Sequence, residues 1–445
     1  MSIQGTITYP GDERYDELRT PWLRVFDQRP ALIVEATSSQ DVAASVRLAR
    51  EKRLALGIMT TGHGIAAACD GGLLLRLTKL KRIDIDAEGR TARVDPGVLA
   101  GELSQALAAR RLAFPIGQVS NVGVAGFTLG GGMGWLVRKL GIAADRIVAA
   151  DVVLADGSLV RASRENDADL LWALRGGGGN FGIVTSLEVE LSALDGVVGG
   201  ERYYAMERAN AVARFYRTWS SQLSNETSTI LRFVSVPPDD SLPAAIRGKT
   251  CCMIGLCHAS PNTADDVLRS LDEIGTPLVD SVRPCTLADM ESLDPASHTS
   301  GAPAYGHVEF LKALTDEIID TLVDRANSMI PPLMQFEVQQ LGGALRERAP
   351  GTGAFHASQA PYLLHLESVP NEVPMSEIAR KTHEVFDALG DAYTGEKYYN
   401  FLRGDEQPIV ARAFASRDFA RLRELKQKYD PDNFFHLNAN VEPAV

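Results

Sequence analysis

The sequence predicts an α+β fold with more than one domain, and three observations carry this prediction. Short apolar runs typical of strands alternate with amphipathic segments typical of helices along the chain. At roughly 100–200 residues per domain, a chain of 445 residues corresponds to two or three domains. The pattern also changes at a glycine-rich stretch over 196–200, which we interpret as a linker. We therefore expect domains over 1–195 and 196–392, and a closing segment over 393–445.

The first region is predicted to contain short, mixed elements up to about residue 191. Ser38-Ser39-Gln40-Asp41 offers an N-cap for a helix over 42–52, and Asp156-Gly157 is a hairpin signal between two apolar runs. The other patterns predict helices at 99–110 and 167–174 and strands at 31–35, 56–60, 72–77, 92–94, 148–154, 159–162 and 183–191.

The second region is predicted to form an antiparallel sheet covered by helices. Strand patterns occur at 230–235, 251–258, 336–341 and 362–368, and helix patterns at 209–223, 263–274, 315–326 and 375–389. The closing segment is expected to hold a helix over 419–429 and then an irregular, Asn-rich ending.

Composition and charge exclude several functional classes. A net charge of −12 argues against nucleic acid or an anionic membrane as a partner. The N-terminus lacks the pattern of a signal peptide, and no apolar run approaches the ~20 residues of a membrane-spanning helix. The five cysteines form no zinc-like pair, so we expect no metal site, and reduced thiols indicate a cytoplasmic protein. Both a monomer and a homodimer are compatible with the sequence.

Two sequence patterns resemble nucleotide-binding loops, but their neighbouring residues do not fit such loops. The segment over 177–182 has the letters G-x-G-x-x-G, but a helix precedes it and a strand follows it. The dinucleotide fingerprint needs the opposite order, because the pyrophosphate must meet the N-terminus of a helix. Gly248-Lys249-Thr250 lacks the first glycine of a phosphate loop, since position 243 is Pro.

Two other segments are stronger candidates for a cofactor site. The first is Thr60-Thr61-Gly62-His63-Gly64, and the second is the glycine-dense stretch PIGQVSNVGVAGFTLGGGMG over 115–134. Glycines let the backbone approach a ligand closely, and consecutive N–H groups can cradle phosphate. A helix-packing surface or a flexible loop would also be rich in glycine, and a histidine in a turn is often solvated. We expect a site for a large anionic cofactor, with His63 as a candidate point of covalent attachment.

These segments resemble a known family. TTGHG followed by DGGLLLRLTKLKRIDID, then VGVAGFTLGGGMGWLVRKLGIAADRIVAADVVLADG and DLLWALRGGGGNFGIVT, are similar to the FAD domain of berberine-bridge-enzyme-like oxidases. These oxidases belong to the vanillyl-alcohol-oxidase fold group. The ending YYNFLRGDE…RLRELKQKYDPDNFFHLNANVEP resembles the closing segment of the family. The resemblance covers nearly the whole chain, and the two termini look most like the bacterial 6-hydroxy-D-nicotine oxidase type.

The resemblance implies a PCMH-type two-part FAD-binding domain, with a core over about 27–194, and an α/β substrate domain. It implies an 8α-histidyl bond between His63 and FAD. Many relatives carry a second link from a cysteine, but that position is Val119 here, so we expect a single covalent bond. The other FAD contacts carried over are Thr60, Thr61, Gly62, Gly64, Pro96, Gly97, Gly117, Val122, Gly123, Gly126, Gly182, Ile183, Val184, Asn400 and Asn438.

The resemblance also implies an activity. A C–H next to oxygen or nitrogen of an amine, sugar or natural-product alcohol would lose hydride to flavin N5. Molecular oxygen would then reoxidise the flavin and yield hydrogen peroxide. The small side chain of Val122, at a position associated with oxygen access, favours an oxidase. The alternatives are a dehydrogenase or cyclase of secondary metabolism, or a flavin-binding protein without oxidase turnover.

Candidate catalytic and substrate-binding residues come from both domains. Tyr398, in the pattern Tyr398-Tyr399-Asn400, is either a base or a structural hydrogen-bonding group. Tyr305 is a second candidate for catalysis and substrate binding, with a core aromatic as the alternative. Glu337 and Gln339 alternate on one predicted strand and therefore share a face, either roofing the site or facing solvent. We expect Glu337 to act in catalysis and both residues to bind a basic or polyhydroxylated substrate.

Overall fold

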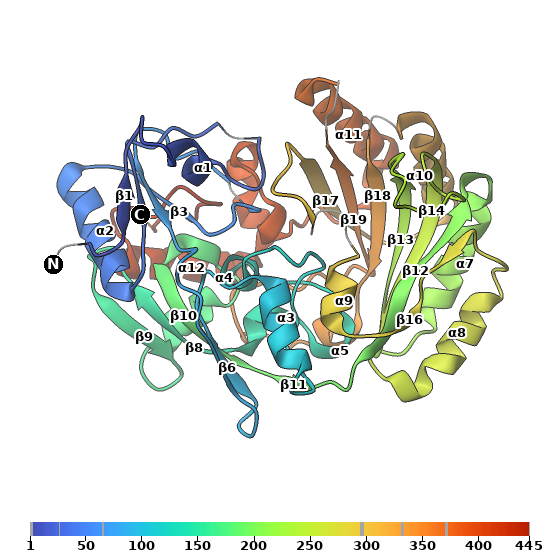
Figure 1. Ribbon diagram of the computed structural model, residues 1–445, viewed down its shortest axis with the longest axis horizontal. Helices are drawn as coiled ribbons and strands as arrows, with labels where there is room; N and C mark the ends of the chain where they lie inside the picture. Colours follow the sequence, from blue (N-terminus) through green and yellow to red (C-terminus); the bar gives the residue numbers. More distant parts are fainter. Residues whose placement is uncertain are drawn as a thin grey trace.

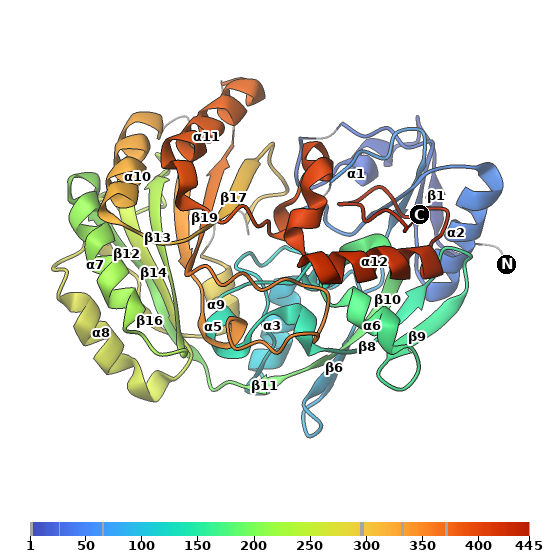
Figure 2. The same ribbon diagram turned by 180° about the vertical axis from the view of Figure 1, so that it is seen from behind.

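The computed structural model describes residues 3–25, 27–64, 66–293, 298–330, 333–369 and 373–444. Two lobes lie side by side in Figure 1. The first part of the chain forms one lobe, and the residues from β12 (Val197–Ala205) to α11 (Met375–Leu389) form the other. The closing segment returns to the first lobe, where α12 (Ser416–Tyr429) packs along α6 (Ala168–Leu174), as Figure 2 shows. The fold is mixed α+β, as the sequence predicted.

The first lobe begins with a four-stranded sheet in the order β1 (Thr6–Thr8), β2 (Leu32–Glu35), β4 (Leu73–Arg76), β3 (Leu56–Met59). The pair β1–β2 is antiparallel, whereas β4 pairs with β2 and β3 in parallel. Helix α2 (Ser39–Lys52) connects β2 to β3, and its N-cap Ser38 accepts a hydrogen bond from the Asp41 backbone at 3.1 Å. This cap is the one predicted, and it places the apolar face of α2 on the sheet.

A five-stranded antiparallel sheet completes the first lobe. Its order is β5 (Ile83–Asp86), β6 (Thr91–Val94), β10 (Ile183–Glu190), β8 (Ile147–Val153), β9 (Leu159–Ser163). Helices α3 (Ala100–Ala108) and α6 share its core. The glycine-dense segment, which has no predicted secondary structure, contains the short helix α4 (Val124–Leu129), and the short helix α5 (Val137–Leu140) follows it. The remaining elements of this lobe are α1 (Tyr15–Arg19), β7 (Leu112–Ala113), η1 (Ala143–Arg146), η2 (Gly178–Asn180) and β11 (Ser192–Ala193).

The second lobe is built on a large antiparallel sheet covered on one face by helices. The strand order is β15 (Val279–Asp280), β12, β14 (Thr250–His258), β13 (Thr227–Ser235), β18 (Gln335–Gln340), β19 (Tyr362–Ser368) and β17 (Tyr305–Leu311). A further short strand, β16 (Arg283–Cys285), pairs with β12 outside this order. Helices α7 (Ala209–Ser221), α8 (Ala264–Asp272), α10 (Asp316–Met329) and α11 lie on the side away from the first lobe in Figure 1. The bare face of the sheet is therefore turned toward the first lobe.

Shorter elements join these parts. They are η3 (Met206–Arg208), η4 (Pro261–Thr263), α9 (Leu287–Glu291), η6 (Gly343–Leu345), η7 (Gly390–Ala392), η8 (Tyr399–Phe401) and η9 (Gly404–Ala413).

The predicted linker over 196–200 is wrong, because these residues open the long strand β12. Val197 and Val198 are buried in the sheet. The two glycines allow close packing and do not interrupt the strand. A Cβ at Gly199 would lie 2.3 Å from Met290 Sδ, and one at Gly200 would lie 2.6 Å from the Ser281 carbonyl oxygen. Their glycine content therefore resembles that of a linker although they lie in a strand, and β17 (Tyr305–Leu311) is a further strand that the sequence pattern did not predict.

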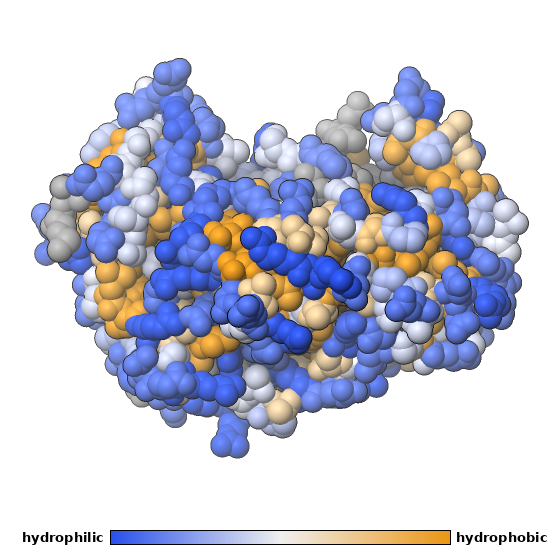
Figure 3. All heavy atoms as spheres, turned by 60° about the horizontal axis from the view of Figure 1, so that its bottom comes forward, coloured by the Kyte–Doolittle hydropathy of each residue, from blue (hydrophilic) through white to orange (hydrophobic). Residues whose placement is uncertain are grey.

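The surface and the cysteines of the described residues show no sign of a membrane-spanning helix or a metal site. In Figure 3 apolar side chains form separate patches between polar ones. The described part of the chain contains no helix with the length and apolar character needed to cross a membrane. The five cysteines are free thiols, and Cys251, Cys252 and Cys257 lie buried in β14, as predicted. Among the described residues, no group of three or more His, Cys, Asp or Glu side chains could hold a metal ion.

Candidate active site

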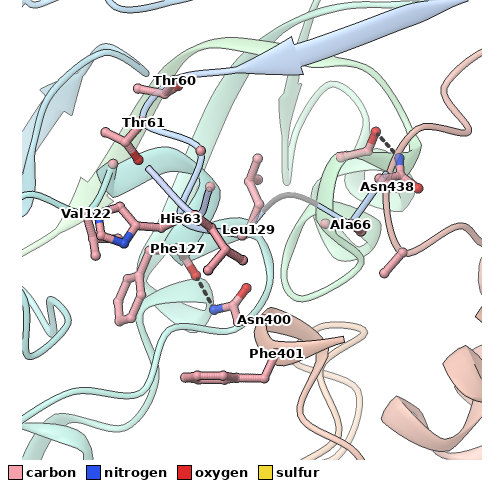
Figure 4. Close-up of a pocket in the computed structure, with 18 of the residues that line it drawn as sticks. Thr60, Thr61, His63, Ala66, Val122, Phe127, Leu129, Asn400, Phe401 and Asn438 are labelled. Atoms are coloured by element: carbon pink, nitrogen blue, oxygen red, sulfur yellow. Dashed lines mark hydrogen bonds between the residues drawn. The ribbon is translucent and has the colours of Figure 1, made fainter. Parts of the chain in front are cut away.

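A cavity of about 470 Å³ lies where the two lobes and the closing segment meet. Its walls come from the loop after β3, the glycine-dense segment, the start of β10, the bare face of β18 and β19, and residues 398–403 and 435–439. Figure 4 shows His63 beside Val122, with Asn400 and Asn438 on other sides of the open space. Segments that are far apart in the sequence therefore share one site.

His63 is the most distinctive residue of this cavity. Its imidazole stacks on Trp22 with ring centroids 4.0 Å apart and planes 17° apart. The Nε2 atom is buried and has no hydrogen-bonding partner among the described residues, although the cavity lies beside it. Burial lowers the pKa of His63 to about 4, and hydrogen bonding to Asn121 opposes this shift. The ring is therefore neutral at physiological pH, and none of the described residues uses its Nε2 atom.

The glycines around the cavity serve two different purposes. Gly126 lines the cavity, and no atom lies within 4 Å of the position that its Cβ would take. At Gly64 the nearest atom would be the Asn400 carbonyl oxygen, 3.9 Å away. By contrast, a Cβ at Gly130 would lie 1.7 Å from Asn400 Oδ1. Some glycines leave bare backbone facing the cavity, as a large cofactor requires, and others are imposed by protein packing.

The structure brings together most of the residues expected to contact a cofactor. Gly97 is the exception, because it is absent from the cavity lining and its Cβ would meet the carbonyl oxygens of Leu80 at 2.4 Å and Leu77 at 2.6 Å. Val119 lines the cavity with an apolar side chain where relatives with a second link carry cysteine. The expected residues that line the cavity are Thr60, Thr61, Gly62, His63, Gly64, Pro96, Gly117, Val122, Gly123, Gly126, Gly182, Ile183, Val184, Asn400 and Asn438.

Tyr398 reaches the cavity, but its hydroxyl oxygen is held by the protein. It accepts hydrogen bonds from the Met133 backbone N–H and from Asn400 Nδ2, both at 3.0 Å. The same Asn400 amide also donates to the Phe127 carbonyl oxygen at 2.9 Å, which Figure 4 marks. Burial raises the pKa of Tyr398, so the phenol stays neutral at ordinary pH. These contacts favour the structural alternative over a role as general base.

Strand alternation decides which residues of the second lobe face the cavity. Gln335, Glu337 and Gln339 of β18 all line it, whereas the residues between them pack under the helices. Tyr305 does not line the cavity. Its neighbours Ala304 and Gly306 do, so its own ring lies on the helix side of β17. The structure therefore supports the core alternative for Tyr305, whose ring lies 4.0 Å from the Arg403 guanidinium carbon.

The sequence analysis missed the partner of Glu337. Arg232 on β13 lies directly opposite Glu337 in the strand register. Its Nε donates to Glu337 Oε2 at 3.0 Å, and its Nη2 donates to the same oxygen. Both residues are 5% exposed, and Arg232 Nη1 lies 3.9 Å from Glu201 Oε1. The carboxylate charge at the cavity wall is thus compensated by a guanidinium beside it on the same face of the sheet.

His365 and Glu367 of β19 were missed as well, although both line the cavity. Gln335 Nε2 donates to Glu367 Oε2 at 2.9 Å, and the His365 ring lies 5.0 Å from that of Phe401. The alternation rule applied to the predicted strand over 362–368 would have placed both on one face. The pairing of Arg232 with Glu337 depends on strand register, for which the sequence carries no comparable signal.

Comparisons with known proteins agree with this geometry. Residues 30–163 match the family described as "FAD binding domain", and residues 397–442 match "Berberine and berberine like". These two matches supply opposite walls of the cavity. The chain therefore combines an FAD-binding domain of the PCMH type with a berberine-bridge-enzyme-like C-terminal segment. The cavity fits FAD, since it joins bare backbone at Gly126 to a partnerless histidine nitrogen.

This chain aligns over its whole length with two of the known proteins and over part of a third. It is 29% identical to (R)-6-hydroxynicotine oxidase of Paenarthrobacter nicotinovorans over 100% of this chain and 98% of the relative. The crystal structure of 6-hydroxy-D-nicotine oxidase from Arthrobacter nicotinovorans superimposes with a TM-score of 0.88 at 26% identity, covering 100% and 99% of the two chains. A xylooligosaccharide oxidase of Thermothelomyces thermophilus is 38% identical over 37% of this chain and 34% of its own length.

Proposed function

We propose that the protein is an oxidase that holds FAD through a single covalent bond to His63 and oxidises a hydroxylated small molecule. The observation that carries this proposal is the buried, neutral and partnerless Nε2 of His63, which opens into a cavity with a polar wall on the second lobe. Val119 supports the single bond, because it offers no thiol at the position of the second link.

The proposed bond joins an imidazole nitrogen of His63 to the 8α carbon of FAD. The imidazole loses its N–H proton, and the 8α carbon loses one hydrogen as a proton. Forming the bond would release two electrons and two protons in all, and molecular oxygen would accept them as hydrogen peroxide. The neutral state of His63 favours this step, because a protonated imidazole has no free electron pair.

Bound FAD would supply the acceptor for the hydride that leaves a substrate carbon. The chain's own residues hold and orient the reactants. The loop over 60–64 and the bare backbone at Gly126 would hold the cofactor. Phe401 and Leu363 line the cavity as apolar groups that exclude water. Both hydrogen bonds from Arg232 end on Glu337 Oε2, so we assign Oε1 to accept the hydroxyl proton of the substrate.

The charge pattern of the cavity favours a neutral polyhydroxylated substrate over an ammonium ion. The Glu337 carboxylate already faces a guanidinium, and the Glu367 carboxylate accepts from Gln335. Gln339 and Arg403 add hydrogen-bonding groups to the same wall. Such a wall offers many directed hydrogen bonds, and the guanidinium groups of Arg232 and Arg403 accompany its two carboxylates. One relative is named as an oxidase of xylooligosaccharides, which supports this class.

Acid precipitation and peroxide assays test the proposal. We expect the precipitated protein to stay yellow, and His63→Ala to release all of its FAD into the supernatant. Peroxide release should occur with neutral sugars and polyols and should be weaker with matched amines. A colourless wild-type precipitate would contradict the covalent bond. Turnover with a dye acceptor but not with oxygen would identify a dehydrogenase instead.

A further inference from the structure

The attachment residue His63 is held by a segment that precedes it by forty residues. Trp22 stacks on the imidazole, and the backbone around Trp22 pairs with the loop that carries His63. Trp22 N donates to the Thr61 carbonyl oxygen at 2.9 Å, and Leu23 N donates to that of Gly62 at 3.1 Å. The indole and the imidazole are therefore fixed to each other through both side chain and backbone.

The second lobe forms hydrogen bonds with the two residues that contact His63, Trp22 and Asn121. The Thr299 carbonyl oxygen accepts from Trp22 Nε1 at 3.3 Å and from Asn121 Nδ2 at 3.2 Å. Trp22 is the residue stacked on His63, and Asn121 is the residue that hydrogen-bonds to it. Backbone pairing strengthens the connection, since Ala302 N donates to the Trp22 carbonyl oxygen at 2.9 Å. One carbonyl group of the second lobe thus secures the neighbours of His63.

We infer that Trp22 is a positioning residue for covalent attachment of FAD, fixed in place by the Thr299 carbonyl of the second lobe. The inference rests on the proposed bond to His63. An imidazole attached to a glycine-flanked backbone can otherwise turn about two side-chain torsions. Bond formation requires the attacking nitrogen and its electron pair to be aligned with the carbon atom, and small misplacements are costly. The stacked indole limits the ring to one plane while leaving Nε2 toward the cavity.

Tryptophan variants of the full-length protein test this role. Trp22→Ala removes the stack, and Trp22→Phe keeps an aromatic ring but removes the N–H that binds Thr299. Trp219→Phe is the matched control, because Trp219 is a buried tryptophan of α7 in the second lobe, bonded to Ser270 Oγ at 2.8 Å. Each purified protein is analysed for total bound flavin, and then for flavin that stays with the acid-precipitated chain and for intact mass.

The rate of covalent incorporation into flavin-free protein should fall about tenfold or more in Trp22→Ala, with total FAD binding retained. Trp22→Phe should recover only part of the rate, because it keeps a ring to stack on His63 but loses the bond to the Thr299 carbonyl oxygen. Trp219→Phe should match the wild type. Normal covalent incorporation in Trp22→Ala would overturn the inference. Loss of dissociable and covalent FAD together would also overturn it, because Trp22 would then be needed for binding or folding and not for attachment. A wild-type protein with only dissociable FAD would instead refute the proposed bond itself.

Discussion

At the scale of single residues, the site depends on polar atoms that the fold has removed from water. His63 Nε2 is buried beside the cavity, whereas the Tyr398 hydroxyl oxygen is buried and held by two donors. Burial favours the neutral form of both groups, so it lowers the pKa of His63 and raises that of Tyr398. The difference lies in the partners, because only His63 keeps an atom that no described residue uses.

The lowered pKa of His63 predicts a pH-dependent stability of the flavin-free protein. Its pKa is about 4 in the folded protein against an ordinary 6.5, so the unfolded chain binds more protons between these values. The free energy of unfolding should therefore fall as the pH is lowered from 6.5 toward 4. At pH 5 this cost is about 2 kcal/mol.

Urea unfolding at pH 7 and pH 5 measures this cost. His63→Gln should lose less stability between the two values than the wild type, because glutamine does not titrate. His436→Gln, a substitution at an exposed histidine, is the control and should behave as the wild type does. Equal losses in His63→Gln and the wild type would contradict the prediction.

Tyr398→Phe should reduce stability more than it changes the pH dependence of turnover. The substitution leaves the Met133 N–H and one Asn400 N–H without their buried acceptor, which costs about 1–3 kcal/mol for each group. Urea unfolding measures the loss, and Tyr9→Phe at an exposed tyrosine is the control. If Tyr398 were the base, the acidic limb of the rate profile would disappear in the variant, because a base acts only in its deprotonated form.

At the scale of elements, the alternation of a strand could be predicted where the strand itself was recognised. The pattern over 335–339 placed Glu337 and Gln339 on one face, and the structure confirms this. Tyr305 could not be placed in the same way, because β17 was not predicted and its phase was therefore unknown. The alternation of side chains does not predict the Arg232–Glu337 pair. Predicting it requires the order and register of two strands that are about a hundred residues apart in the sequence.

The pairing of β13 with β18 predicts a strong energetic coupling between Arg232 and Glu337. Arg232→Met leaves a buried carboxylate without its counter-charge, which should cost about 3–5 kcal/mol of unfolding free energy. Arg232→Met combined with Glu337→Gln removes both charges and should restore much of that loss. A double-mutant cycle based on urea unfolding gives the coupling energy.

An exposed ion pair provides the matched control for this cycle. Lys81 and Glu102 approach to 2.7 Å, but both are well exposed, and such pairs couple by about 0–1 kcal/mol. Additive losses for Arg232→Met and Glu337→Gln would show that the charge at the cavity wall is not compensated by Arg232. That result would also remove the main reason for expecting a neutral substrate.

At the scale of the whole molecule, the cavity exists only because the two lobes and the closing segment meet. The sequence predicted the elements on either side and, through resemblance, a set of cofactor contacts, most of which line the cavity. It gave no signal for the junction between the lobes, because the residues that join them are far apart in the chain and carry no shared motif. Trp22 with Thr299 and Arg138 with Leu341 are examples of such contacts.

The buried hydrogen bonds of Arg138 predict that the stability of each lobe depends on contact with the other. Arg138 extends from α5 of the first lobe and is only 6% exposed. Its guanidinium donates to the carbonyl oxygens of Thr227 at 2.8 Å and Leu341 at 2.7 Å, and also to those of Leu223 and Ser224. All four acceptors belong to the second lobe. Arg138→Met should therefore leave buried carbonyl groups unsatisfied and weaken the junction selectively.

Calorimetry and limited proteolysis separate this effect from a general loss of stability. We expect the wild type to unfold in one transition, and Arg138→Met to show two, with earlier cleavage near residues 194–197, where the chain passes from one lobe to the other. Arg110→Met, at an exposed arginine whose bond to Ala106 stays within one helix region, should leave the single transition intact. A single transition shifted to lower temperature in Arg138→Met would mean that the lobes unfold together. The cavity would then belong to one cooperative unit.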